Sequence, residues 1–250
     1  MKKVIIALIC IIILALGVIG FFVWQDSRPK PINVQPSGED NITKGLAELT
    51  EVVPVTIKEE ARGVNRIVNV TYPTIQSFSN KNFQKYVNDN ITKVIFAYRD
   101  EINAIVDDET PASNLYTYNT SYEKYTHGDY LSLVILNDYQ TGGIRSNKWK
   151  DTYNVNVRSE RLLYLKDIFA SNVDYEKEIL AEIKKQAEKN HYVLMNGTGL
   201  EQLNDNQKFY IKDEKLIIYF DPAEIAPATY GELQFEMPFI LEEGKFKVSI

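Results

Sequence analysis

The sequence predicts an α+β protein: two small antiparallel sheets, each with one long amphipathic helix, preceded by a single transmembrane helix. Three observations lead to this fold class. Several short stretches alternate apolar and polar residues with a period of two, which is typical of strands, and two longer ones repeat near 3.6, which is typical of helices. A further stretch at the N-terminus is apolar throughout. The chain has 250 residues, 44% of them hydrophobic, enough for one medium domain or two small ones.

The apolar stretch runs from Val4 to Trp24 without a charged side chain. It is long enough to cross a bilayer as a helix, so residues 1–24 are predicted to anchor the chain in the membrane. A cleaved signal peptide is the alternative, but its apolar core is usually about 7–15 residues long. Lys2 and Lys3 favour a cytoplasmic N-terminus, which places the remaining chain outside the cell.

The charge balance outside this segment argues against nucleic-acid binding. Of 28 Lys and Arg, 26 lie beyond the anchor against 34 Asp and Glu, a net charge of −8. Nucleic-acid binding would need a basic face. The single cysteine, Cys10, lies within the apolar segment. We therefore expect the outer domain to be stabilised by its hydrophobic core and not by disulfides.

Residues 25–51 are rich in Pro, Ser, Asn and charge and are predicted to form a flexible tether. The first folded half is placed at residues 52–140. Runs of β-branched residues open it and predict two strands. Apolar residues then recur at steps of three and four from Phe83 to Ile102, which predicts a long helix with Ser79 as its N-cap. Two more strands follow, and the four strands are placed at 54–58, 66–72, 115–122 and 130–136.

The second half is placed at residues 141–250. Alternating residues predict a strand and a short partner after a turn. A helix is predicted from Asp174 to Lys189, because acids occupy its first turns and lysines its last, which complements the helix dipole. The turn at Asp213-Glu214 joins two apolar runs as a hairpin. The strands of this half are placed at 153–157, 161–165, 209–212, 215–220 and 232–239.

No catalytic signature is present. The two histidines, His127 and His191, stand in no metal-ligand spacing, so neither a metal nor a cofactor is predicted. The chain also lacks the GxSxG motif and the glycine-rich phosphate-binding motifs. Acids at turns, such as Asp138 and Asp221, could pair for glycoside hydrolysis, but nothing selects two of them.

Surface recognition is the remaining possibility, and two loops supply its candidate residues. Tyr, Trp and Arg are enriched where proteins bind partners. Two prolines stiffen the segment 219–231, so it would lose less entropy when a partner docks. A purely structural role for Trp149, as a lid on the sheet edge, and for this loop, as a connection, stays open. The candidate ligand-binding residues are Gly142, Gly143, Arg145, Trp149, Pro227 and Tyr230.

The order of these motifs resembles a known family. Its most specific parts are an LxDIF segment at 165–169 and an EIAP segment at 224–227, within a likeness that covers about residues 52–239. The family is the RsiV/PdaC-like extracytoplasmic domain, shared by a lysozyme-sensing anti-sigma factor and a peptidoglycan deacetylase. This sequence departs from the family where Ile144-Arg145 replaces Ala-His after the diglycine, and where the tyrosine of an APY motif is displaced to Tyr230.

The resemblance implies a fold and a binding or sensing role in the envelope of a Gram-positive-type bacterium, without implying that lysozyme is the ligand. Only three residues precede the anchor, too few for a sigma-binding segment, and no deacetylase domain follows. We therefore expect a non-catalytic extracellular domain that binds a wall polymer or a secreted protein such as a lysozyme. The alternatives are an enzyme acting on wall polysaccharide and an accessory domain that positions a membrane complex.

Overall fold

The computed structural model describes residues 45–61, 65–105, 114–143, 145–195, 200, 202–242 and 244–248. All of them lie in one compact unit, residues 42–250. The predicted anchor at 1–24 and most of the predicted tether are outside the described residues. Within the described ranges, no helix is both long enough and apolar enough to span a bilayer.

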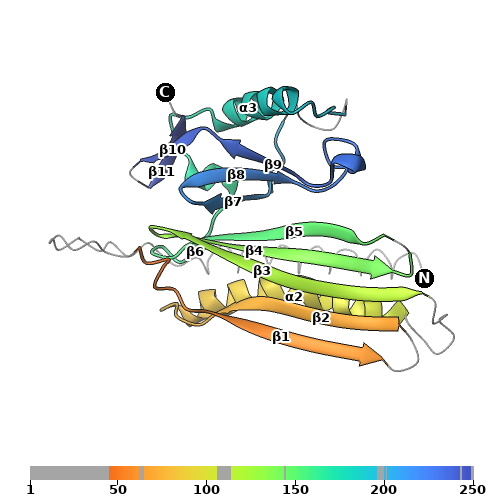
Figure 1. Ribbon diagram of the computed structural model, residues 1–250. Helices are drawn as coiled ribbons and strands as arrows, with labels where there is room; N and C mark the ends of the chain where they lie inside the picture. Colours follow the sequence, from red (N-terminus) through yellow and green to blue (C-terminus); the bar gives the residue numbers. More distant parts are fainter. Residues whose placement is uncertain are drawn as a thin grey trace, which may run out of the picture. The chain divides into compact units, whose positions relative to one another are not determined.

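The larger sheet has six strands in the order β1-β2-β3-β4-β5-β6 (Figure 1). Neighbouring strands are antiparallel except β2 and β3, which run parallel. The strands are β1 (Val52–Ala61), β2 (Asn65–Ile75), β3 (Leu115–His127), β4 (Tyr130–Thr141), β5 (Asn147–Asn156) and β6 (Arg161–Leu162).

The helix α2 (Lys81–Ile105) connects β2 to β3 and covers one face of this sheet. Its buried stripe, which includes Ile91 and Ile95, packs against residues of β2, β3 and β4. The N-cap of the helix is Asn80 and not the predicted Ser79, because the Asn80 side chain accepts the backbone N–H groups of Asn82 and Phe83 at 3.1 and 3.0 Å. This is the bonding pattern of an N-cap.

A smaller sheet and a second helix form the other part of the fold. The strands β7 (Phe209–Lys212), β8 (Lys215–Phe220) and β9 (Leu233–Met237) are antiparallel, with β8 in the middle. The helix α3 (Tyr175–Lys189) covers one face, and β10 (Phe239–Glu242) and β11 (Lys245–Val248) form a hairpin. Short 3₁₀ turns lie at η1 (Leu165–Ile168) and η2 (Ala228–Tyr230).

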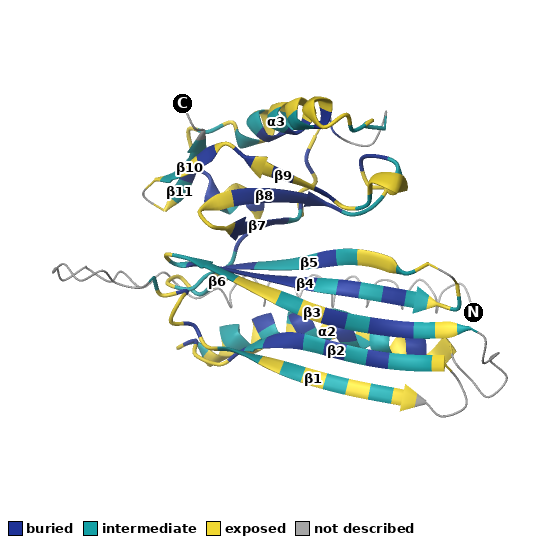
Figure 2. Cartoon of the chain, in the orientation of Figure 1, coloured by how far each residue is buried: buried dark blue, intermediate teal, exposed yellow. Residues whose placement is uncertain are grey.

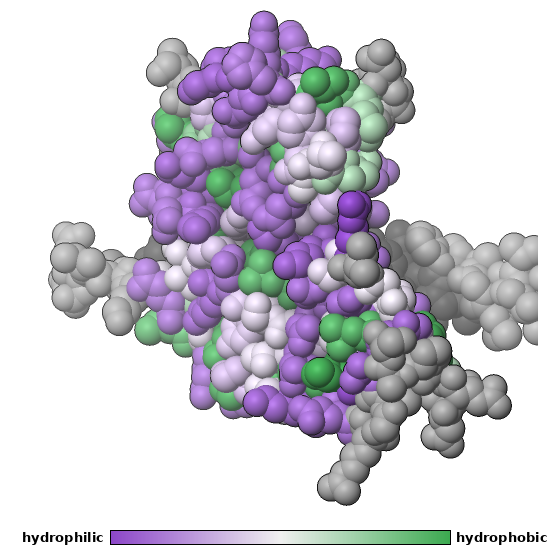
Figure 3. Space-filling view, turned by 45° about the vertical axis from the view of Figure 1, so that its right-hand side comes forward, coloured by the Kyte–Doolittle hydropathy of each residue, from purple (hydrophilic) through white to green (hydrophobic). Residues whose placement is uncertain are grey.

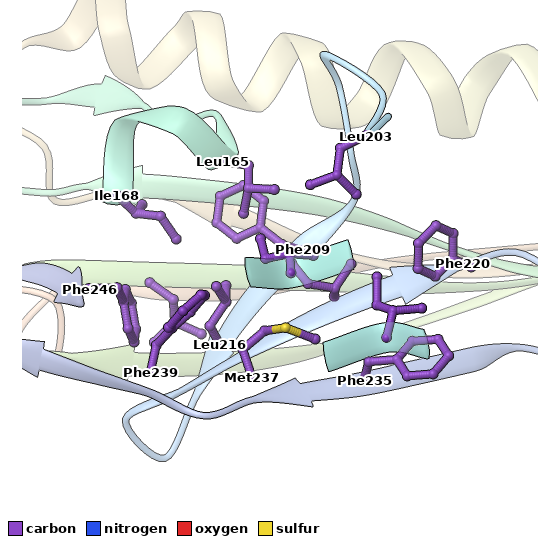
Figure 4. Packing of buried hydrophobic residues seen from close by; sticks show 14 of the residues in the cluster. Leu165, Ile168, Leu203, Phe209, Leu216, Phe220, Phe235, Met237, Phe239 and Phe246 are labelled. Atoms are coloured by element: carbon purple, nitrogen blue, oxygen red, sulfur yellow. The ribbon is translucent and has the colours of Figure 1, made fainter. Parts of the chain in front are cut away.

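The core of this part is rich in phenylalanine. Side chains from β7 to β11 and from η1 converge in it (Figure 4). The Phe169 ring stacks on Tyr175 at 4.8 Å and meets the edge of Phe239 at 5.0 Å. β8 is buried along nearly its whole length, whereas the edge strand β1 is half-buried on one face and exposed on the other (Figure 2).

The predicted α+β class and both long helices are confirmed, but the expectation of two antiparallel sheets was wrong. β5 and β6, which we assigned to the second half, extend the first sheet, so its last strand ends at Leu162 and not near residue 140. Alternation identifies a strand and its buried face, but not its partner. The helix between β2 and β3 allows them to pair in parallel, because parallel neighbours need a crossover connection, but the sequence pattern does not require this pairing. The placement of the domain boundaries stays a prediction.

The smaller sheet packs on the face of the larger sheet that α2 leaves open. Val134 of β4, Tyr210 of β7 and Ile217 of β8 form a small shared core, and Tyr125 stacks on Tyr210 at 5.6 Å. The described region is therefore built of four layers: α2, the six-stranded sheet, the three-stranded sheet and α3 (Figure 1).

Two buried side chains join the sheets by hydrogen bonds. Asn154 of β5 donates to the Phe209 carbonyl at 2.8 Å, and Ser132 of β4 accepts the Ile211 N–H at 3.0 Å. Ser132 and Asn154 lie opposite each other and are themselves bonded at 2.6 Å. We call this pair the polar tie. It satisfies backbone groups on the edge of β7 that faces the larger sheet, where an unpaired group would be costly.

Replacing Asn154 by Ala should therefore destabilise the fold. The Phe209 carbonyl would stay buried without a donor, and we expect the free energy of unfolding to fall by about 1–3 kcal/mol. Chemical denaturation of the full chain measures this. Asn147→Ala, at an exposed position of the same strand, is the control and should change the free energy by less than about 0.5 kcal/mol. Equal effects of the two variants would contradict the role of the tie.

Candidate functional site

A groove of about 410 Å³ lies over the larger sheet, beyond the residues that contact β7. β3, β4 and β5 form its floor, and Glu232, just before β9, stands at its wall. Both sheets therefore contribute to one surface. The lining residues are Asn119, Thr120, Ser121, Leu136, Asn137, Asp138, Lys148, Trp149, Lys150 and Glu232.

Most of the side chains that line the groove are polar, although apolar atoms supply more of its exposed surface. Strand residues alternate between the two faces of a sheet. On β4, the residues on the α2 face are apolar up to Ile135, whereas Asp138 lies on the groove face. Lys148 lies opposite it on β5, and the Lys148 Nζ is 3.4 Å from the Asp138 carboxylate. In a space-filling view of one face of the molecule, hydrophilic residues predominate and hydrophobic patches are small and separate (Figure 3).

Lys150 is the most buried cation of the groove, with a side chain that is 9% exposed. Its Nζ lies 2.6 Å from Glu232 and 5.2 Å from the centre of the Tyr219 ring. Burial of a charge is tolerated only when it is paired and hydrogen-bonded. The ion pair therefore joins β5 to the start of β9 and sets the width of the groove at this point.

A second lysine, Lys208, contacts the backbone of Lys150 and stabilises the same part of the groove. Lys208 donates to the Lys150 carbonyl at 2.8 Å and to the Asp221 carboxylate at 2.6 Å. The Lys150 N–H donates to the Tyr219 hydroxyl at 3.1 Å. Burial, followed by the charge of Asp221, raises the pKa of Tyr219, so this phenol stays neutral. Two cations and two carboxylates thus compensate each other around one tyrosine.

Trp149 is an internal side chain more than an exposed anchor. It is half-buried, and its ring packs against Tyr98 of α2 at 4.7 Å and near Tyr139 at 6.3 Å. The indole N–H donates to the Asp151 carboxylate at 3.1 Å, which also accepts from Asn137 at 3.0 Å. The indole therefore closes one end of the core beneath α2, in agreement with the structural alternative.

The residues near the diglycine lie in the turn between β4 and β5, outside the groove lining. Gly142 has φ +73°, and its N–H donates to the Leu115 carbonyl at 2.9 Å. A Cβ at this position would come within 2.9 Å of the Tyr116 hydroxyl. The turn thus needs glycine at 142 for its own geometry. Gly143 accepts a hydrogen bond from Gln140, and Arg145 is exposed.

The loop from Asp221 to Gly231 is attached to the core by its middle. Ile225 and Ala226 are 2% and 3% exposed, whereas Pro227 is half-buried and Tyr230 is 37% exposed. The Tyr230 ring packs against Tyr192 at 5.3 Å. Neither Pro227 nor Tyr230 lines the groove, although Glu232, two residues beyond Tyr230, does.

Of the six candidates, Trp149 alone is among the residues that line the groove. The residues that shape the groove most directly, Lys150 and Glu232, were missed in the sequence. Lys150 directly follows the candidate Trp149 in the sequence, whereas no pattern singles out Glu232. In the described part of the chain, no three His, Cys, Asp or Glu side chains gather as a metal site would require.

Asp151 should make stability depend on pH. Burial raises its pKa above the ordinary value of 3.8, opposed by the charge of Lys208 and by the hydrogen bonds from Trp149 and Asn137. A raised carboxyl pKa means that folding disfavours the ionised form, so this group costs stability as pH rises above 3.8. We expect Asp151→Asn to raise the melting temperature at neutral pH and to bring less benefit near pH 3.8.

Thermal unfolding of the full chain at both pH values measures this difference. The exposed Asp205, in a turn before β7, supplies the control variant Asp205→Asn, which should leave the pH dependence of wild type nearly unchanged. A variant Asp151→Asn whose stability differs from wild type by the same amount at both pH values would refute the assignment.

Comparison with known proteins places the chain among distant relatives. Residues 166–239 match the DUF3298 family, a family of unknown function. The chain is 23% identical over 236 residues to the peptidoglycan-N-acetylmuramic acid deacetylase PdaC of Bacillus subtilis, covering 92% of this chain and 46% of PdaC. It is 24% identical over 221 residues to the anti-sigma-V factor RsiV of the same organism, covering 83% of this chain and 75% of RsiV.

Solved structures of DUF3298 family proteins share the fold. One from Bacteroides fragilis has a TM-score of 0.56 at 15% identity, over 80% of this chain and 94% of its own. One from Pseudomonas aeruginosa has a TM-score of 0.53 at 14% identity, over 75% and 88%. The chain spans about half the length of PdaC. The resemblance stated from the sequence is confirmed: residues 166–239 match the DUF3298 family, and RsiV and PdaC are homologues of the chain at low identity.

Proposed function

We propose that this chain is a membrane-anchored protein whose folded domain, outside the cell, binds a cell-wall component or a secreted protein without catalysis. The observation that carries the proposal is the groove between the two sheets. It is open, most of its lining residues are polar, it is built on strands, and its charged groups are paired with one another. Such a surface offers hydrogen bonds to a ligand while keeping its own shape.

The internal pairing favours binding over catalysis. A general acid or base must reach the proton that it transfers. In this groove, Glu232 lies 2.6 Å from Lys150, and Asp138 lies 3.4 Å from Lys148. These carboxylates are held by cations of the same protein. The alternative is an enzyme that acts on wall polysaccharide through such acids. It requires at least one of these carboxylates to leave its ion pair.

The relatives point in the same direction. The name of PdaC describes an enzyme that acts on peptidoglycan, and the name of RsiV describes a regulator. The alignment covers 46% of PdaC but 75% of RsiV. A region common to an enzyme and a regulator suits a task that both need, and recognition of a molecule in the envelope is such a task. The apolar segment at 4–24 supports the placement of this domain outside the membrane.

The proposal predicts that blocking the groove abolishes binding. Ser121 is exposed and lines the groove, so Ser121→Trp would fill it without disturbing the core. The full chain, purified in mild detergent, is mixed separately with purified wall sacculi, with lysozyme and with proteins from a culture supernatant. We expect wild type to retain at least one of these and Ser121→Trp to retain it about tenfold less, which corresponds to about 1.4 kcal/mol.

Ser171→Trp is the matched control, because Ser171 is exposed in a turn before α3 and does not line the groove. It should bind as wild type does. Equal binding by the two tryptophan variants would show that the groove is not the site. Release of soluble products from peptidoglycan fragments by the wild-type chain would favour the enzyme instead.

A further inference from the structure

A row of polar side chains crosses the larger sheet and enters the groove. The strand register places Lys58 opposite Asn69, and Asn69 opposite Asn119. Asn119 in turn lies opposite Asp138, and Asp138 opposite Lys148. We call these five residues the polar row. Each lies next in sequence to residues of the α2-facing core, so the row occupies the other face of the sheet.

The row is accessible and long. Lys58 and Lys148, at its ends, are exposed, and the three residues between them are half-buried. Neighbouring strands are about 4.8 Å apart, so a row across five strands extends over about 19 Å. A second line of hydroxyl groups runs beside it, where Thr56 and Thr71 are bonded at 3.0 Å. The surface is therefore an array of hydrogen-bonding groups spread across five strands of one sheet.

The chemistry of the row selects among ligands. It contains no apolar or aromatic side chain, whereas the centre of a protein–protein interface is usually enriched in both. The side-chain amides of Asn69 and Asn119 each donate and accept hydrogen bonds. Their mutual contact, at 3.4 Å, leaves most of this capacity unused. Hydroxyl and acetamido groups are the natural partners of such amides.

The charges of the row and of the whole chain further restrict the class of ligand. Asp138 is matched by Lys148, and Lys58 adds one positive charge at the far end. The chain as a whole carries a net charge of −6, which disfavours a strongly anionic polymer. An extended, uncharged polymer with many hydroxyl and amide groups fits both the length and the charge of the row.

We propose that the polar row binds an extended polysaccharide of N-acetylated sugars, which runs across the strands and ends in the groove. This inference rests on the proposed function and names its ligand as the glycan of a wall polymer. A secreted protein is then the outcome that would overturn it.

The test uses the linear hexamer of N-acetylglucosamine as the probe and the full chain in mild detergent. Isothermal titration compares wild type with the double variant Asn69→Ala/Asn119→Ala. Loss of two hydrogen-bonding amides should weaken binding about tenfold or more. The control is Asn82→Ala/Asn206→Ala, which removes two exposed asparagines from other surfaces and should bind within about twofold of wild type.

The exposed ends of the row supply a second variant, Lys58→Ala/Lys148→Ala, which avoids half-buried positions. It should also weaken hexamer binding, and circular dichroism checks that each variant is folded. Hexamer binding by the folded row variants that equals the control would overturn the inference. If Ser121→Trp still abolished binding in that case, the groove and the proposed function would stand.

Two further outcomes distinguish the proposed glycan ligand from the proposed function of the groove. A wild-type chain that binds lysozyme or a supernatant protein but not the hexamer would overturn the glycan and leave the proposed function intact. If the wild-type chain binds none of these probes, or if Ser121→Trp binds them as well as wild type does, both the glycan ligand and the proposed function are refuted.

Discussion

The arrangement of this domain depends on the contact between β7 and the larger sheet. A strand edge pressed against another layer must find partners for its backbone groups, since water cannot reach them. Here Ser132 and Asn154 provide those partners at 3.0 and 2.8 Å. Because the contact is polar and directional, it fixes where the smaller sheet sits, which a purely apolar contact would specify less well. The uncovered end of the larger sheet, and hence the groove, follows from that position.

The groove exists because the smaller sheet covers only part of the larger sheet. β7 packs against β4 and β5 around Val134 and Asn154, and the outer ends of the same strands stay uncovered. The pair of Lys150 and Glu232, 2.6 Å apart, closes the gap between the layers at the limit of this contact. A surface built in this way keeps its shape without a ligand, because strands and the ion pair of the buried Lys150 with Glu232 define it.

Much of the fold could be predicted from the sequence, because local patterns specify helices and strands. The helix predicted from Asp174 to Lys189 is α3, and the run from Phe83 to Ile102 lies within α2. Pairing between distant strands carries no such local pattern, so the membership of β5 and the parallel β2–β3 pair could not be predicted. The same limit applies to the site: Trp149 stands out by residue type, whereas Lys150 and Glu232 acquire meaning only when the fold brings them together.

The hydrogen bonds at Lys150 have one more consequence. β6 pairs only with Val155 and Asn156 of β5, so most of that border would be open to a strand from another molecule. The Tyr219 hydroxyl and the Lys208 ammonium occupy both backbone groups of Lys150, and at the opposite border of the sheet Pro54 of β1 has no N–H to donate. Side chains that occupy or interrupt a sheet border discourage fibre-like stacking of copies. The wide sheet therefore presents few free backbone groups at these positions to a strand of another copy.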